Sequence, residues 1–94
     1  MTEPQSLLDP SSPADSIPIT VLFFSFAAER VGAHRVSRAV PRHTTVGALF
    51  AEYEAQLGAG ADRFLFSVNE AWAPRTRELG AGDVMAIIPP VAGG

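Results

Sequence analysis

The chain has 94 residues, 47% of them hydrophobic and 18% charged, which fits one small globular domain. Seven basic residues against ten acidic ones give a formal net charge of −3, which disfavours binding to the phosphate backbone of a nucleic acid. No segment approaches the roughly 18 apolar residues that cross a bilayer, and the first residues lack the pattern of a signal peptide. We therefore expect a cytoplasmic protein that binds neither nucleic acid nor membrane.

The chain contains no cysteine, which excludes disulfides, zinc-thiolate sites and thiol nucleophiles. It also contains no lysine, which excludes Schiff-base chemistry on a lysine amine and isopeptide formation at a lysine of this chain. Its two histidines, His34 and His43, lie outside any metal-binding spacing, so we expect no metal site. Ser25, His43 and Asp83 could be combined on paper into a catalytic triad, but no turn of the GxSxG type presents the serine.

The N-terminal segment is poor in large apolar residues. Residues 2–16 hold several prolines and serines, with Leu7 and Leu8 as the large hydrophobic side chains. That is too little apolar surface to offset the entropy lost on ordering the segment. We therefore predict a disordered tail over residues 1–16 and one folded domain over residues 17–94.

The first half of that domain predicts a hairpin followed by a helix. Residues 19–26 are almost wholly apolar and β-branched or aromatic, the pattern of a strand buried on both faces. Residues 27–33 predict a turn, and residues 34–40 the second arm of the hairpin. Apolar residues then recur at helical spacing up to Leu57. Their pattern indicates a helix capped by Thr44 or Thr45 and ended by Gly58 in a left-handed conformation.

The second half predicts further strands and completes the fold class. Residues 64–68 alternate as a strand, a short strand lies near Trp72, and a turn at residues 80–83 leads into the apolar strand 84–88. The first and last strands are the most apolar, so we place them side by side in the middle of a mixed sheet covered on one face by one main helix. This arrangement is an α+β roll. The aromatic residues are assigned to the core, with Trp72 or an outward-facing phenylalanine as a lesser candidate for a partner surface. The core candidates are Phe24, Leu49, Phe66 and Ile87.

Two surface features remain. A basic strip lies along the second strand, and its positive charge either discourages sheet-to-sheet pairing, the interpretation that we favour, or docks an acidic partner. The strip consists of His34, Arg35, Arg38, Arg42 and His43. The second feature is the end of the chain, which runs Ile88-Pro89-Pro90-Val91-Ala92-Gly93-Gly94.

The residues of this ending suit delivery into a partner. Pro89 and Pro90 lack N–H donors and hold the next residues extended, while Gly93 and Gly94 lack a Cβ and fit a narrow channel. Extended over residues 89–94, the segment reaches at most roughly 20 Å. We expect a flexible tail in which Pro89, Pro90, Val91, Ala92 and Gly93 contact the partner and Gly94 presents the reactive carboxyl group.

From about Ile19 to Gly94 the sequence resembles the small subunit of molybdopterin synthase, a family of ubiquitin-like sulfur carriers. The resemblance is carried by the segments VLFFSFAAERVG, TTVGAL, SVNEAW, GAGDVMAIIPP and PPVAGG. It implies a β-grasp fold and a Gly94 carboxyl group that becomes an acyl adenylate and then a thiocarboxylate. The implied partners are the large subunit of the synthase, a ubiquitin-activating-like adenylating enzyme that uses ATP, and a sulfur donor protein.

The same resemblance implies a role in forming the dithiolene of molybdopterin, with no bound cofactor and no catalysis by this chain alone. Three alternatives stay open on the sequence. They are a thiamine-type sulfur carrier, a ubiquitin-like protein modifier joined through Gly94 to lysines of its targets, and a binding module with an incidental tail.

Overall fold

The computed structural model describes residues 15–58 and 60–90. Strand β1 begins at Ser16, one residue before the predicted start of the folded domain. The carbonyl of Asp15 accepts a hydrogen bond of 3.2 Å from the N–H of Arg42. Residues 1–14, which make up most of the predicted tail, lie outside the described residues.

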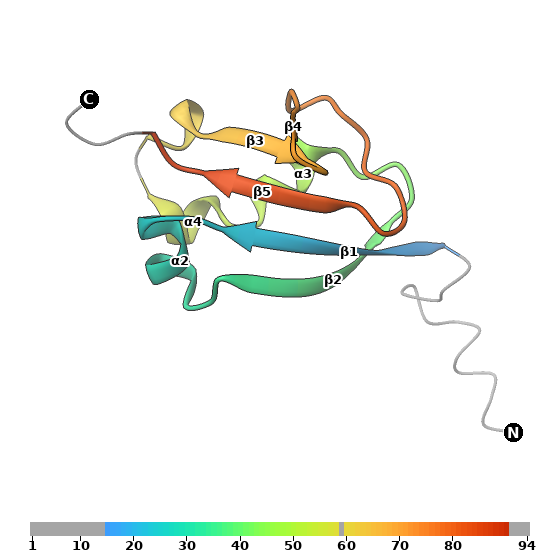
Figure 1. The fold of residues 1–94 in the computed structure, drawn as a ribbon, viewed down its shortest axis with the longest axis horizontal. Helices are drawn as coiled ribbons and strands as arrows, with labels where there is room; N and C mark the ends of the chain where they lie inside the picture. The colour runs from blue at the N-terminus through green and yellow to red at the C-terminus, as the bar shows by residue number, and fades with distance from the viewer. Residues whose placement is uncertain (1–14, 59, 91–94) are drawn as a thin grey trace, which may run out of the picture.

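The folded part is built on a mixed five-stranded sheet in the order β2-β1-β5-β3-β4 (Figure 1). The strands are β1 (Ser16–Phe23), β2 (Arg35–Pro41), β3 (Leu65–Val68), β4 (Ala71–Trp72) and β5 (Val84–Ile88).

The first and last strands lie side by side in the middle of this sheet, as the sequence predicts. β5 runs parallel to β1, with Thr20 opposite Val84 and Phe23 opposite Ile87. On its other side β5 pairs antiparallel with β3. A mixed sheet accompanied by a few short helices is the α+β architecture of the ubiquitin-like β-grasp.

The hairpin between β1 and β2 contains a helix where the sequence predicts a turn. Helix α2 (Phe26–Val31) ends at Gly32, whose left-handed conformation lets its N–H bond to the carbonyl of Ala28 at 2.8 Å. The prediction for residues 27–33 was wrong because Ala27 and Ala28 are strong helix formers and both are buried. Their burial supplies the packing that a single short helical turn needs.

The predicted helix of residues 46–57 forms in two pieces, α3 (Val46–Ala51) and α4 (Glu54–Leu57). Thr45 caps α3 as predicted, since its side chain accepts a hydrogen bond from the N–H of Ala48 at 3.1 Å. Between the two pieces, the N–H of Tyr53 bonds to the carbonyl of Phe50, which tightens the turn. The ring of Tyr53 then packs edge-on against Phe23, with centroids 4.9 Å apart.

Gly58 ends α4, but not in the predicted left-handed conformation. Its φ of 80° is positive while its ψ of −156° is extended, a combination that side chains with a Cβ avoid. The guanidinium of Arg30 donates to the carbonyl of Leu57 at 2.8 Å, so α2 helps to close the end of α4. A short 3-10 turn, η1 (Ala61–Arg63), leads into β3.

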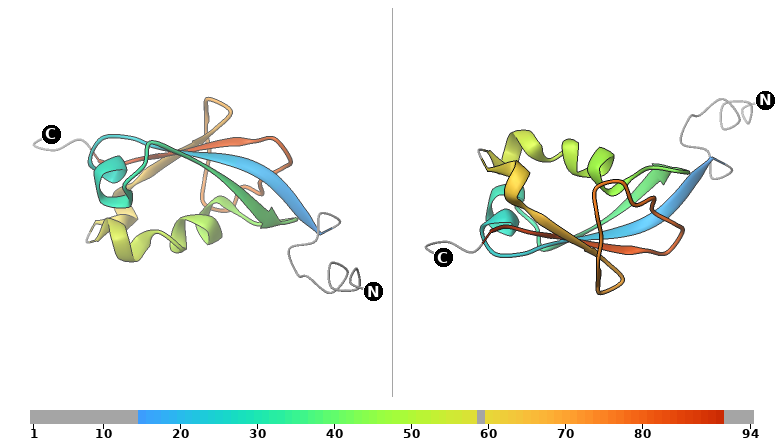
Figure 2. Two further views of the ribbon diagram at one scale, coloured as in Figure 1. Left: turned by 90° about the horizontal axis from the view of Figure 1, so that it is seen from below. Right: turned by 90° about the horizontal axis from the view of Figure 1, so that it is seen from above.

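The main helices cover one face of the sheet and leave the other open (Figure 2). Burial therefore alternates along β1: Ile19, Val21 and Phe23 are buried, while Thr20 and Leu22 between them are partly exposed. The prediction that residues 19–26 are buried on both faces was wrong. The core lies between the sheet and the helices, and its largest fully buried side chains are Phe23, Phe50, Leu49, Leu57, Met85 and Ile87.

The predicted core residues lie on both faces of the sheet, and only those on the face covered by the helices are buried. Leu49, Phe66 and Ile87 are buried, but Phe24 is 47% exposed because it follows β1 on the open side. Trp72, which the sequence analysis also assigned to the core, is 72% exposed. None of the helices in the described part of the chain is long and apolar enough to cross a membrane.

Phe23, the last residue of β1, and Phe24, which follows it, test this division. Phe23→Ala removes a fully buried ring and should lower the free energy of unfolding by about 3–5 kcal/mol. Phe24→Ala should cost about 1 kcal/mol or less, because nearly half of that side chain already faces solvent. Urea unfolding followed by circular dichroism measures both. Equal losses for the two variants would contradict the assignment of the faces.

Candidate functional site

The candidate site is the end of β5 together with the open side of the sheet around it. β5 is apolar throughout and is held between two strands, so the chain beyond Ile88 leaves from the middle of the sheet. Pro89 is buried and Pro90 half-buried, and Phe24 donates its N–H to the carbonyl of Ile87 at 3.2 Å. These contacts fix the direction in which the chain leaves the sheet.

The remaining predicted site residues, Val91, Ala92, Gly93 and Gly94, lie outside the described residues. Pro89 and Pro90 are the members of the predicted set that the structure describes, and they follow directly on β5. Their contact with a partner stays a prediction.

The start of β5 is anchored by a hydrogen-bond network around Asp83. Its carboxylate accepts bonds from the N–H of Gly80 at 2.7 Å and from the side-chain amide of Asn69 at 2.9 Å. The carbonyl oxygen of that same amide accepts from the N–H of Val84 at 2.9 Å. The network ties the turn before β5 to the turn between β3 and β4, which fixes β5 lengthwise in the sheet.

Burial by itself would raise the pKa of Asp83. The hydrogen bonds from Gly80 and Asn69, together with the charge of Arg77 at 3.8 Å, outweigh burial and hold the pKa of this carboxyl below its ordinary value. The folded state therefore favours the charged carboxylate more than the unfolded state does.

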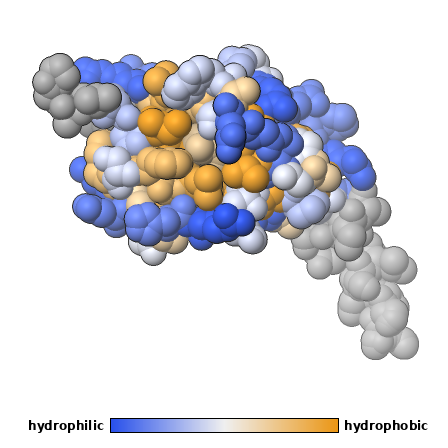
Figure 3. Space-filling view, viewed as in Figure 1, coloured by the Kyte–Doolittle hydropathy of each residue, from blue (hydrophilic) through white to orange (hydrophobic). Residues whose placement is uncertain are grey.

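An apolar surface surrounds the exit of the chain on the open side of the sheet. The strand register places these residues on one face, away from the helices. We call this surface the open-face patch, and it comprises Leu22, Phe24, Leu65, Trp72, Ala86 and Ile88. Figure 3 shows hydrophobic residues gathered on this face with hydrophilic residues around them.

The most exposed members of the patch are large: Phe24 is 47%, Leu65 54% and Trp72 72% exposed. Contiguous apolar surface of this kind, rimmed by polar residues, marks an interaction site on a small protein.

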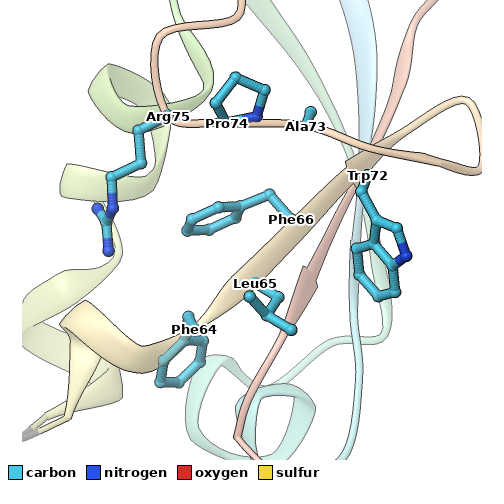
Figure 4. Close-up of a pocket in the computed structure, with 7 residues that line it drawn as sticks. All are labelled: Phe64, Leu65, Phe66, Trp72, Ala73, Pro74 and Arg75. Carbon is cyan, nitrogen blue, oxygen red and sulfur yellow. The ribbon is translucent and has the colours of Figure 1, made fainter.

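Two open depressions shape this surface. One, of about 420 Å³, lies between Phe24 and Leu22 on one side and the turn at Asn69 and Glu70 on the other. The other, of about 550 Å³, runs round the edge of β3 from Trp72 to Arg75 (Figure 4). Both are lined mainly by apolar surface and suit side chains of a protein partner.

Phe24 was predicted to be a core residue and Leu65 was not singled out, yet both side chains lie at the surface. A signal for Leu65 was present, because residues 64–68 alternate and Phe66 belongs to the core, which puts Leu65 on the opposite face. Phe24 lies in an apolar run without alternation, so the sequence carried no comparable signal for it.

The other chemical candidates do not come together. Ser25 follows the end of β1, whereas His43 follows β2 near the start of β1, where its ring bonds to Glu78 at 3.0 Å. The carboxylate of Asp83 is engaged by Gly80 and Asn69. Over the described residues no group of His, Asp and Glu could hold a metal ion. The described residues bring together an apolar surface beside the end of β5.

Comparison with known proteins identifies the family. Residues 21–94 match the model of the ThiS family. This chain belongs to the ThiS family. It is thus a ubiquitin-like sulfur carrier, with the β-grasp that the resemblance implied.

Solved structures agree with this fold. SAMP1 of Haloferax volcanii is 25% identical, with a TM-score of 0.70 over 82% of this chain and 99% of that one. The ubiquitin of Caldiarchaeum subterraneum is 18% identical, with a TM-score of 0.59 over 84% and 99%. A chain of the complex between subunits 1 and 2 of the molybdopterin-converting factor of Helicobacter pylori is 20% identical, with a TM-score of 0.56 over 83% and 100%.

The Asp83 network predicts a pH dependence of stability. The pKa of Asp83 is lower in the folded state than in the unfolded state, so its charged carboxylate stabilises the folded state. This stabilisation is complete above the unfolded pKa near 3.9 and is lost as the pH falls through the folded pKa. Asp83→Asn should therefore lower the free energy of unfolding by about 1–3 kcal/mol at pH 7. The difference from wild type should shrink below about pH 4.

Denaturant titrations across this pH range measure the difference. Asp62→Asn, at an exposed carboxylate, is the control and should change stability by less than about 0.5 kcal/mol at any pH. A constant difference between Asp83→Asn and wild type down to pH 2 would contradict the role assigned to the charge.

Proposed function

We propose that this chain is the sulfur-carrying small subunit of a molybdopterin synthase and that the sulfur is carried on the carboxyl group of Gly94. The observation that carries the proposal is the Pro-Pro-Val-Ala-Gly-Gly sequence placed directly after a central strand. Membership of the ThiS family supports the carrier role. The details of the ending favour the molybdenum pathway over thiamine synthesis.

The chemistry starts from a carboxylate, which is a poor electrophile until it carries a leaving group. An adenylating enzyme supplies one when a carboxylate oxygen attacks the α-phosphate of ATP and pyrophosphate departs. The terminal sulfur of a persulfide on the sulfur donor protein then attacks the carbonyl carbon, and AMP leaves. A thiol of the partner cleaves the S–S bond of the resulting acyl disulfide and forms a disulfide with the donor, which leaves a thiocarboxylate on Gly94. ATP is bound by the partner enzyme, and this chain binds no cofactor in the proposal.

The composition of the chain protects the activated end. With no cysteine and no lysine, the chain offers no thiol or side-chain amine that could capture its own acyl adenylate. Gly93 and Gly94 leave the carbonyl carbon open to attack because neither has a Cβ. The acyl group is therefore available to the sulfur donor supplied by the partner.

The open-face patch is the proposed binding surface for the large subunit. It surrounds the end of β5, so a partner that covers Phe24, Leu65 and Trp72 is positioned to receive the chain that follows Pro90. The Helicobacter pylori neighbour, which is a complex of two molybdopterin-converting factor subunits, supports a partner of this kind. No active site is needed on this chain itself.

A protein-modifier role is the second candidate. It is favoured by the 25% identity to SAMP1, since the corresponding Haloferax volcanii protein is described as a small archaeal modifier protein. A modifier forms an amide bond between Gly94 and a lysine of its target, whereas a carrier ends in a thiocarboxylate. Mass spectrometry of the protein from cells that can activate it separates the two, because a carrier exchanges one oxygen for sulfur and a modifier appears as lysine-linked conjugates.

Changes at Gly94 test the attachment point. Deleting Gly94, or adding one alanine after it, moves the terminal carboxylate by roughly 3.3–3.6 Å. Because even a 1 Å misplacement can cost on the order of 100-fold in rate, both variants should abolish sulfur transfer. Thermal unfolding should be unchanged, since the core lies between the sheet and the helices.

Each variant is incubated with ATP, the adenylating enzyme and a sulfur donor, and the thiocarboxylate is detected by mass. Dithiolene formation is then assayed with the large subunit. Transfer at the wild-type rate by the extended variant would exclude Gly94 as the attachment point.

Substitutions in the patch test docking. Leu65→Glu and Trp72→Glu place a charge in the proposed interface and should weaken binding to the large subunit by about 30-fold or more, as hot-spot residues do. Ala48→Glu, on the exposed side of α3, is the matched control and should bind like wild type. Titration calorimetry gives the affinities. Wild-type affinity of both patch variants would place the interface elsewhere.

A further inference from the structure

The outer edge of β2 is an unusually long open edge in this sheet. β2 lies at the end of the strand order and runs for seven residues, whereas β4 at the opposite edge has two. Short edge strands limit unwanted pairing, and β4 is protected in this way. Over residues 15–58 and 60–90, β1 is the one strand that pairs with β2, so its other edge is uncovered by the described chain.

The register identifies the backbone groups on that edge. Phe23 donates its N–H to the carbonyl of His34 at 2.9 Å, and Arg42 donates to the carbonyl of Asp15 at 3.2 Å. In an antiparallel ladder, alternate residues bond to the same neighbour, so residues 34, 36, 38, 40 and 42 face β1. The N–H and C=O groups of Arg35, Ser37 and Ala39 therefore point outward, where a further strand would bond to them.

Positive charge lies at both ends of this edge. Arg35 and Arg42 are exposed, and the structure gives neither guanidinium an ion pair within the part of the chain that it describes. Arg38, between them, is half-buried and is held by the carboxylate of Glu52 at 2.7 Å and the hydroxyl of Tyr53 at 2.8 Å. The charge at the ends is available to a ligand, whereas the charge in the middle is neutralised.

This distribution of charge decides which kind of strand can pair with the outer edge of β2. A second copy of the chain would bring its own Arg35 and Arg42 against the same strip, and like charges across paired strands are destabilising. An acidic extended segment meets both requirements of the edge, because its backbone completes the ladder and its carboxylates approach the free guanidiniums. The two interpretations of the basic strip are thus compatible: the charge opposes self-pairing and favours an acidic partner.

We propose that the outer edge of β2 binds an acidic segment of a partner protein, which adds to the sheet as an extended strand paired with Arg35, Ser37 and Ala39. The edge is separated from β5 by β1 and is distinct from the open-face patch. A partner can therefore hold it while the patch and the end of the chain are engaged. The proposal does not depend on the sulfur chemistry assigned to Gly94.

The experiment uses the full ¹⁵N-labelled chain and an acetylated peptide of about eight residues, a typical strand length, with two consecutive glutamates at each end and valines between them. Consecutive glutamates place a carboxylate on each face of the strand, because Arg35 and Arg42 lie at positions of opposite alternation. Binding should shift the amide signals of Arg35, Ser37 and Ala39 and slow their hydrogen exchange, while the β1-facing amides of Val36 and Arg38 keep their exchange rates. Raising the salt concentration should weaken binding. A peptide with lysine in place of glutamate, and an acidic peptide with N-methylated backbone, are the ligand controls and should not bind.

Two variants separate backbone pairing from charge. Ser37→Pro removes an outward N–H without removing a bond to β1, and it should weaken peptide binding by at least about tenfold. Arg35→Glu keeps the backbone and should weaken binding by about two- to fivefold or more. Arg63→Glu, at an exposed arginine of η1, is the matched control and should bind like wild type. The amide spectrum of each variant confirms its fold.

The proposal is overturned if the β2 amides do not respond at millimolar peptide, or if the lysine peptide binds equally well. It is also overturned if the peptide responds to Arg63→Glu as strongly as to Arg35→Glu. Concentration-dependent broadening of the β2 signals without peptide would assign the edge to a second copy of the chain instead.

Discussion

The parallel pairing of β1 with β5 is the contact on which the rest of the molecule depends. It places the first and last strands of the domain in the centre of the sheet, where each has a second neighbour, β2 or β3. The buried side chains of both strands, including Val21 and Ile87, form the side of the core against which the helices pack. Because of this pairing, the chain after Ile88 leaves from the middle of the sheet, and the residues of the open-face patch lie around the point where it leaves.

Much of this architecture could be predicted because it rests on local patterns. The apolar runs of β1 and β5 identified them as central neighbours, and Thr45 at the start of an apolar periodicity identified a helix cap that the structure contains. Pro89 and Pro90 after the last predicted strand indicated where the chain leaves the sheet. These features depend on residues close together in the sequence, where hydrophobic period and backbone propensity decide the outcome.

The faces of the sheet could not be predicted in the same way. Whether Phe24 is buried depends on whether a second layer covers that side, and the described helices pack on the opposite side. An apolar run such as β1 is typical both of a doubly covered strand and of a strand whose second face binds a partner. The short helix α2 escaped prediction for a related reason, since its stability comes from burying Ala27 and Ala28 against the rest of the core.

The central position of β5 also has a consequence for biosynthesis. β1 is made well before its partner in the middle of the sheet, since Thr20 lies opposite Val84. Contacts between residues so distant in sequence close large loops, which slows folding and keeps the sheet incomplete while the ribosome is still translating. The β1–β5 ladder therefore forms only after β5 has left the exit tunnel. A ribosome that stops before Val84 leaves the apolar strand β1 without its central partner, exposed to chaperones and proteases.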